Sequence, residues 1–341
     1  MAAKYRETDY LYGSARIRAL EPRLLSRDKL EHMLESGDAE AILATLPEFG
    51  FTLAESSEGG AGMRRENSLL SVLEDGFAEL AQIPGGAEFS AFLRIPYDCN
   101  NMKALIKCAA REVSPDSMLF ETLGRVSATD ARLAFEQKRY DAFSPRLAAA
   151  IPEAEAAFAR TGNPQLVDLI LDRACFADML ALAGETEVPY CVELVRMKID
   201  LTNLLTCVRL IRMHLGASAS ALLADALLEG GSLEPSLWQA GLEQGEAALR
   251  ERIATTAYGA LCDGWEDGTP LYLLEKRADD LRMDESSSCF DNKISLNPCI
   301  TVTGVLSSCD AFAKKSLFCF ATAFSAVTSV IIIMQSTVCL K

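Results

Sequence analysis

The feature that most constrains the fold is a short motif that recurs 102 residues further along the chain. Residues 97–107 read YDCNNMKALIK, and residues 199–209 read IDLTNLLTCVR. A fixed period of this length predicts similar structural units placed one after another. The aligned polar positions are Asp98 with Asp200, Asn101 with Asn203, and Lys107 with Arg209.

A leucine followed by an acid precedes each of the two motifs. A third such pair further along the chain indicates a third repeat. These pairs stand at residues 73–74, 171–172 and 274–275, so the acids are 98 and 103 residues apart. A third Asp-x-x-Asn motif is expected near residues 299–303, but the sequence there reads CITVT. We therefore predict three repeats, of which the third is incomplete.

Helix signals dominate the body of the chain. Asn163-Pro164 combines an N-cap residue with proline at the first helical position, and apolar residues follow at helical spacing up to Gly184. A second helix is expected to end at Gly216. Alternating strand patterns are nearly absent, so the sequence predicts an all-α fold. Two further helices are expected, a short one between residues 114 and 124 and a longer one across residues 237–253.

Composition excludes several functions. The net charge of -15 argues against nucleic-acid binding, which needs clustered Lys and Arg. The chain has 2 His, and its 11 Cys form no C-x-x-C pair, so neither a metal site nor a redox site is expected. No nucleotide-binding, metalloprotease or serine-hydrolase motif occurs. We expect no catalytic residue, no cofactor and no small-molecule substrate. Residues 1–9 lack an apolar signal region, which favours the cytoplasm and reduced thiols.

Two roles for the repeated motif remain open. Residues three apart share one face of a helix, so each Asp and Asn could join a buried polar network that fixes helix packing. The same helices could instead line a surface that binds a partner protein. A catalytic carboxylate is least favoured, because no second acid or His repeats with the motif. The candidate residues for packing or partner binding are Asp98, Asn101, Lys107, Asp200, Asn203 and Arg209.

The composition changes near residue 285. The last 57 residues contain five of the 11 Cys, no Arg, and four Lys against three acids, so residues 1–284 carry a charge of -16. Residues 316–334 are uncharged and long enough for a membrane-anchor candidate. The alternative is a tail that is not native coding sequence, as after a frameshift. The missing third motif favours this alternative.

The sequence resembles the family of C subunits of the bacterial and archaeal V/A-type ATPases (V-type ATP synthases), which correspond to the d subunits of eukaryotic V-ATPases. The resemblance covers about residues 5 to 283. It rests on the opening YLYGSARIRALEPRLLSRDKLEHMLES, on YDCNNMKALIK, on LILDRACFADMLALA followed by KIDLTNLLTCVRLIR, and on ALCDGWEDGTPLYLLEKRADD. It implies three helical bundles around a pseudo-threefold axis that form a funnel, with the third bundle incomplete here.

The function that the resemblance implies is mechanical. A protein of this family caps the membrane rotor ring on its cytoplasmic face, receives the central stalk and couples the two during ATP-driven ion transport or ATP synthesis. It is not itself an enzyme. The alternatives are a helical-repeat adaptor unrelated to ATPases, which would stack its repeats openly, and a metal-dependent or carboxylate-based enzyme with acids converging around Asp98 and Asp200.

The repeats predict the domain boundaries. We expect the first repeat in residues 1–125, with N-terminal helices that could pack on the third repeat, and the second repeat in residues 126–225. The partial third repeat spans residues 226–284, and the tail spans residues 285–341. An exposed apolar groove is expected near Tyr272, Leu273 and Leu281, because no partner helix for the third bundle is apparent.

Deleting residues 285–341 should leave the melting temperature of the remaining chain almost unchanged, because a Ser-, Cys- and Thr-rich segment offers no amphipathic stripe for a small bundle. We expect a shift below about 2 °C in thermal unfolding, which corresponds to less than ~1 kcal/mol. A large drop on deletion would show that the tail is a true structural element.

Overall fold

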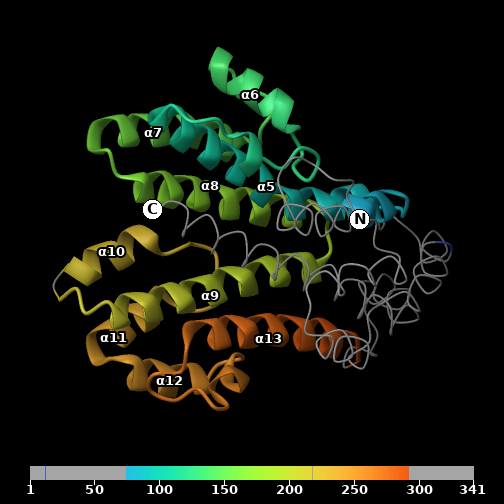
Figure 1. Cartoon of the computed structure of the whole chain (residues 1–341). Helices are drawn as coiled ribbons and strands as arrows, with labels where there is room; N and C mark the ends of the chain where they lie inside the picture. Colours follow the sequence, from blue (N-terminus) through green and yellow to red (C-terminus); the bar gives the residue numbers. More distant parts are fainter. Residues whose placement is uncertain (1–11, 13–73, 217, 292–341) are drawn as a thin grey trace, which may run out of the picture. The chain divides into compact units, whose positions relative to one another are not determined.

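The computed structural model describes Tyr12, residues 74–216 and residues 218–291 (Figure 1). Within these ranges the chain forms helices, turns and loops and no strand, which confirms the all-α prediction. The chain divides into two compact units, one of residues 1–87 with 285–341 and one of Glu88–Asp284. All six candidate residues lie in the second unit.

The second unit is built from consecutive helices joined by turns and loops. Neighbouring helices pack on one another in chain order, α7 on α8, α8 on α9, and α9 on both α10 and α11. The helices are α5 (Gly86–Arg111), α6 (Ala128–Gln137), α7 (Pro145–Thr161), α8 (Pro164–Glu185), α9 (Pro189–Arg212), α10 (Ser218–Ala226), α11 (Pro235–Gln244), α12 (Glu246–Ala254) and α13 (Leu271–Asp291), with short 3-10 turns at Asp116–Met118 and Gly259–Cys262.

The helix starts follow the local chemistry of the sequence. The Asn163 side chain accepts a hydrogen bond from the Gln165 N–H at 3.0 Å, directly before the proline that opens α8. This confirms the predicted N-cap. Ser127 caps α6 in the same way, because its hydroxyl accepts from the Asp130 N–H at 3.0 Å. Each such cap satisfies a donor that the helix itself leaves unpaired.

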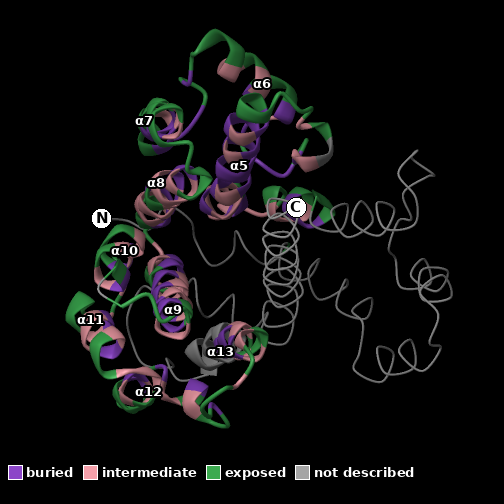
Figure 2. Ribbon diagram, turned by 60° about the vertical axis from the view of Figure 1, so that its left-hand side comes forward, coloured by how far each residue is buried: buried purple, intermediate pink, exposed green. Residues whose placement is uncertain are grey.

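Helix α9 contributes to two hydrophobic cores. Its N-terminal half, with Val195 and Ile199, packs in a core shared with α5, α7 and α8. Its C-terminal half, with Leu204 and Val208, packs in a second core with Trp238 and the helices up to α13. Figure 2 shows the buried side of α9 among these helices. A single helix of 24 residues therefore joins the two cores, so disturbing it disturbs both.

Several predicted boundaries are wrong. Helix α8 runs through Gly184 to Glu185, and α9 ends at Arg212, four residues before Gly216. The segment between residues 114 and 124 holds only a 3-10 turn. The helix expected across residues 237–253 is two helices, because Gly245 at φ 93° breaks it.

The prediction of an exposed apolar groove at the third Leu-acid helix is also wrong in part. Leu281 is buried in the second core, whereas Tyr272 is exposed. Helix α13 continues to Asp291, past the change in composition. The predicted anchor candidate at residues 316–334 lies outside the described residues. None of the described helices is long and apolar enough to cross a membrane.

Candidate functional site

The repeated motif places one Asp and one Asn inside the protein in each repeat. Asp98 and Asn101 lie on α5, and Asp200 and Asn203 lie on α9. All four side chains are at most 3% exposed. A buried polar group costs free energy unless it is hydrogen-bonded, so its partners decide what it contributes.

Each Asn forms hydrogen bonds with both backbone groups of one loop residue. The Asn101 amide donates to the Phe120 carbonyl at 2.9 Å and accepts from the Phe120 N–H at 2.8 Å. Asn203 makes the same pair of bonds with Leu228, both at 2.9 Å. A side-chain amide carries the same donor and acceptor as a peptide, so it can satisfy both backbone groups at once.

Each Asp accepts hydrogen bonds from the backbone of the same loop, a few residues further along the chain. The Asp98 Oδ1 accepts from the Val126 N–H at 3.0 Å. The Asp200 carboxylate accepts from the Ser232 N–H at 2.8 Å and from the Leu233 N–H at 3.2 Å. We call the Asp98–Asn101 pair with residues 120–126 the first loop clamp. The Asp200–Asn203 pair with residues 228–233 is the second loop clamp.

A glycine lies against the carboxylate in both clamps. A Cβ atom at Gly124 would stand 2.3 Å from the Asp98 Oδ1, and one at Gly231 would stand 2.1 Å from the Asp200 Oδ1. Only a residue without a side chain lets the backbone approach this closely. The two repeats therefore share a helix motif, a glycine loop and the contacts between them.

The clamps differ in the side chains that complete them. In the first clamp, Arg94 on α5 donates from its Nε to the Leu123 carbonyl at 3.0 Å and from its Nη2 to the Thr122 carbonyl at 2.5 Å. In the second clamp, the Tyr258 hydroxyl donates to the Asp200 Oδ2 at 2.7 Å. Sequence reasoning missed Arg94 and Tyr258.

This difference leaves Asp98 with fewer donors than Asp200. The Asp98 Oδ2 is buried and accepts no hydrogen bond from the described residues. Burial raises the pKa of Asp98 to about 6, although the Val126 N–H and the nearby Arg125 and Arg94 act in the opposite direction. The carboxylate of the first clamp is therefore held at a cost in free energy at neutral pH.

The basic residues of the motif reach the next Leu-acid helix. Lys107 pairs with Asp168 on α8 at 2.6 Å, and Arg209 pairs with Glu275 on α13 at 2.5 Å. Lys103, which sequence reasoning did not single out, pairs with Asp172 at 2.5 Å. Each motif helix is thus tied by charge to the Leu-acid helix of the following repeat. These partly exposed pairs contribute modestly to stability, on the order of 1 kcal/mol or less each.

Another buried carboxylate was missed as a site candidate. Asp178 on α8 accepts from the Leu147 N–H at 2.9 Å and from the Arg146 N–H at 3.3 Å, at the first turn of α7. It therefore caps a helix other than its own, which local sequence patterns do not reveal. The described residues contain no group of three or more acids, His or Cys that could hold a metal ion.

Together these side chains hold backbone in place. The amides and carboxylates of the clamps bind loop peptide groups, and the cations bind acids of neighbouring helices. The geometry supports a rigid helical body whose loops are fixed from inside.

Asn substitutions at the two Asp positions should differ. Asp200→Asn places an amide where the carboxylate receives three donors, and it should lower the free energy of unfolding at pH 7.5 by roughly 2 kcal/mol. Asp98→Asn removes a charge that is poorly satisfied, so it should cost at least about 1 kcal/mol less. Urea denaturation of both variants measures the difference.

The pH dependence of the first clamp has a definite sign. The pKa of Asp98 is higher in the folded state, about 6, than the ordinary value of 3.8, so the folded chain binds the extra proton between these values. The contribution of Asp98 to stability is complete below pH 3.8 and is lost as the pH rises through 6. Wild-type stability relative to Asp98→Asn should therefore fall by roughly 2–3 kcal/mol from pH 4 to pH 7. A constant difference across this range would contradict the assignment.

Alanine at either clamp glycine should destabilise the protein. Gly124→Ala and Gly231→Ala each force a methyl group against a carboxylate, and each should lower the free energy of unfolding by ~1–3 kcal/mol. Gly184→Ala in α8 is the matched control, because its Cβ would meet no atom within 4 Å. Equal effects at all three positions would rule out the close approach.

Comparison with known proteins gives the family. Curated proteins gave no match. The model of the family described as ATP synthase (C/AC39) subunit matches residues 14–302, which include both loop clamps and the whole of α13. The chain belongs to the ATP synthase (C/AC39) subunit family of the V/A-type ATPases.

Proposed function

We propose that this protein is the non-catalytic part that couples the central stalk of a V/A-type ATPase to its membrane rotor ring. The proposal places it on the cytoplasmic face, peripheral to the membrane, where it binds the ring and receives the stalk. Family membership supports a place in this complex. The coupling role rests on the way the chain uses its polar residues.

The observation that carries the proposal is the pair of loop clamps. The buried Asp and Asn of each repeat bind loop backbone within the chain, and the motif cations bind acids of the next Leu-acid helix. A part that transmits torque must resist deformation between its two points of attachment. Contacts that fix loops and link successive repeats supply this resistance. The sequence-derived units at residues 1–125, 126–225 and 226–284 are the repeats that we propose to be linked in this way.

The charge of the chain indicates how it holds its partners. With a net charge of -15, attachment through anionic lipid would be opposed by repulsion between like charges. The chain should instead bind through complementary shape and through basic residues of the stalk and ring proteins. Such binding weakens as the salt concentration rises.

Reconstitution tests the proposal. Vesicles that carry the complete complex should pump ions when ATP is added, whereas vesicles assembled without this chain should hydrolyse ATP without pumping. Asp200→Ala, which removes the acceptor of the second clamp and should cost ~1–3 kcal/mol of stability, should reduce pumping per ATP hydrolysed. Asp141→Ala, at a carboxylate that is 89% exposed, is the matched control and should pump normally.

Two results would contradict the coupling role. The first is undiminished pumping in vesicles that lack the chain. The second is ATP hydrolysis by the purified chain that disappears in Asp200→Ala, because this would make the buried carboxylate catalytic.

A further inference from the structure

The end of α9 exposes apolar side chains to solvent. Met213 and Leu215 follow the last turn of this helix and are 59% and 36% exposed. Between them, His214 adopts a left-handed backbone at φ 51°, which is unfavourable for a residue with a side chain. The chain therefore turns here in a strained conformation that leaves two large apolar residues uncovered.

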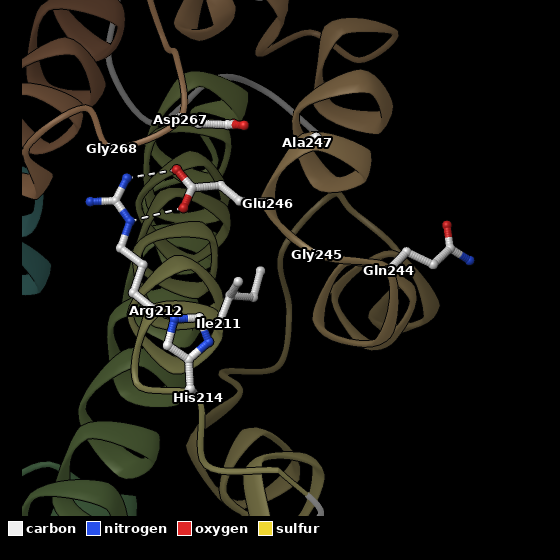
Figure 3. A pocket seen from close by; sticks show the side chains of 9 residues that line it. All are labelled: Ile211, Arg212, His214, Gln244, Gly245, Glu246, Ala247, Asp267 and Gly268. Atoms are coloured by element: carbon white, nitrogen blue, oxygen red, sulfur yellow. Dashed lines mark hydrogen bonds and ion pairs between the residues drawn. The ribbon is translucent and has the colours of Figure 1, made fainter.

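A pocket of about 470 Å³ lies beside this turn. In Figure 3, the Asp267 side chain projects from the loop before α13 at one end of the pocket, and Ile211 and His214 line the opposite end. Ala247 adds a second apolar side chain to the lining. The pocket therefore offers apolar surface together with a carboxylate.

Only one of the two carboxylates at the pocket is available. Glu246 accepts from the Arg212 Nε at 2.9 Å and from its Nη2 at 2.6 Å, and Trp265 donates to it from its indole N–H at 2.7 Å. Asp267 contacts Arg250 at 3.3 Å, but its side chain remains 80% exposed. The carboxylate that the pocket presents to solvent is therefore that of Asp267.

The net charge also favours a cation here, because the chain as a whole carries a charge of -15. A Lys or Arg side chain suits the pocket, because its methylene stem is apolar and its head is charged.

We propose that this corner, formed by residues 211–215 with Ala247 and Asp267, binds a short amphipathic segment of a partner protein. The segment carries a Lys or Arg whose stem lies over Ile211 and Ala247 and whose head binds Asp267. Apolar residues one helical turn away on the segment cover Met213 and Leu215. This surface is separate from the buried loop clamps.

Charge reversal with a matched control tests the proposal. The probe is a synthetic helical peptide of Leu and Lys, titrated into the full-length chain at low salt and followed by fluorescence anisotropy. Asp267→Lys should weaken binding by about tenfold or more. Asp141→Lys changes the net charge equally, at a carboxylate that is 89% exposed on the loop between α6 and α7, and should weaken binding less than about twofold.

A second variant tests the apolar half of the surface. Met213→Ser leaves the charge unchanged and should weaken binding of the same peptide about threefold or more, because it removes apolar area that the segment covers. Unchanged melting temperatures show that the variants remain folded. Equal weakening by Asp267→Lys and Asp141→Lys would overturn the proposal. It would mean that the peptide binds only because the protein as a whole is acidic. Normal binding by Met213→Ser would also overturn it.

Discussion

The structure depends on two pairs of side chains, each a carboxylate and an amide on one face of a helix. Each pair forms hydrogen bonds with the backbone of a loop that contains a glycine. Loops usually satisfy their peptide groups with water, and they move because water competes for these bonds. At residues 120–126 and 228–233 the bonds go to buried side chains instead. The two clamps therefore fix the two loops in place. They can do so because the backbone at Gly124 and Gly231 lies close to the Asp98 and Asp200 carboxylates.

The long helices extend this rigidity from one repeat to the next. Helix α9 shares its side chains between two cores, and Arg209 reaches Glu275 on α13. A displacement applied to one core must therefore move α9 and, with it, the other core. The coupling role that we propose requires this property more than it requires a pocket for chemistry. The exposed corner at the end of α9 offers a different property, a surface that a partner can cover.

The sequence revealed the parts of this arrangement that repeat. Asp98, Asn101, Asp200 and Asn203 could be found because their spacing recurs, and the N-cap at Asn163 because capping is local. Tyr258 could not be found in this way, because it lies 58 residues from its partner. Arg94 could have been found, because Arg196 stands 102 residues further along at the matching position of the second motif. Gly124 was expected to follow a helix, whereas its position is set by a carboxylate on α5. Contacts between distant segments depend on packing, which local patterns do not encode.

Hydrogen exchange at the clamped amides tests the central claim most directly. The N–H groups of Phe120, Val126, Leu228 and Ser232 lie in loops but donate to buried side chains. The account predicts that these four amides exchange as slowly as the interior of α5 and α9, and far more slowly than those of the exposed residues 141–142 in the loop before α7. Exchange of the four amides at the rate of that loop would contradict it, because the clamps would then hold nothing in solution.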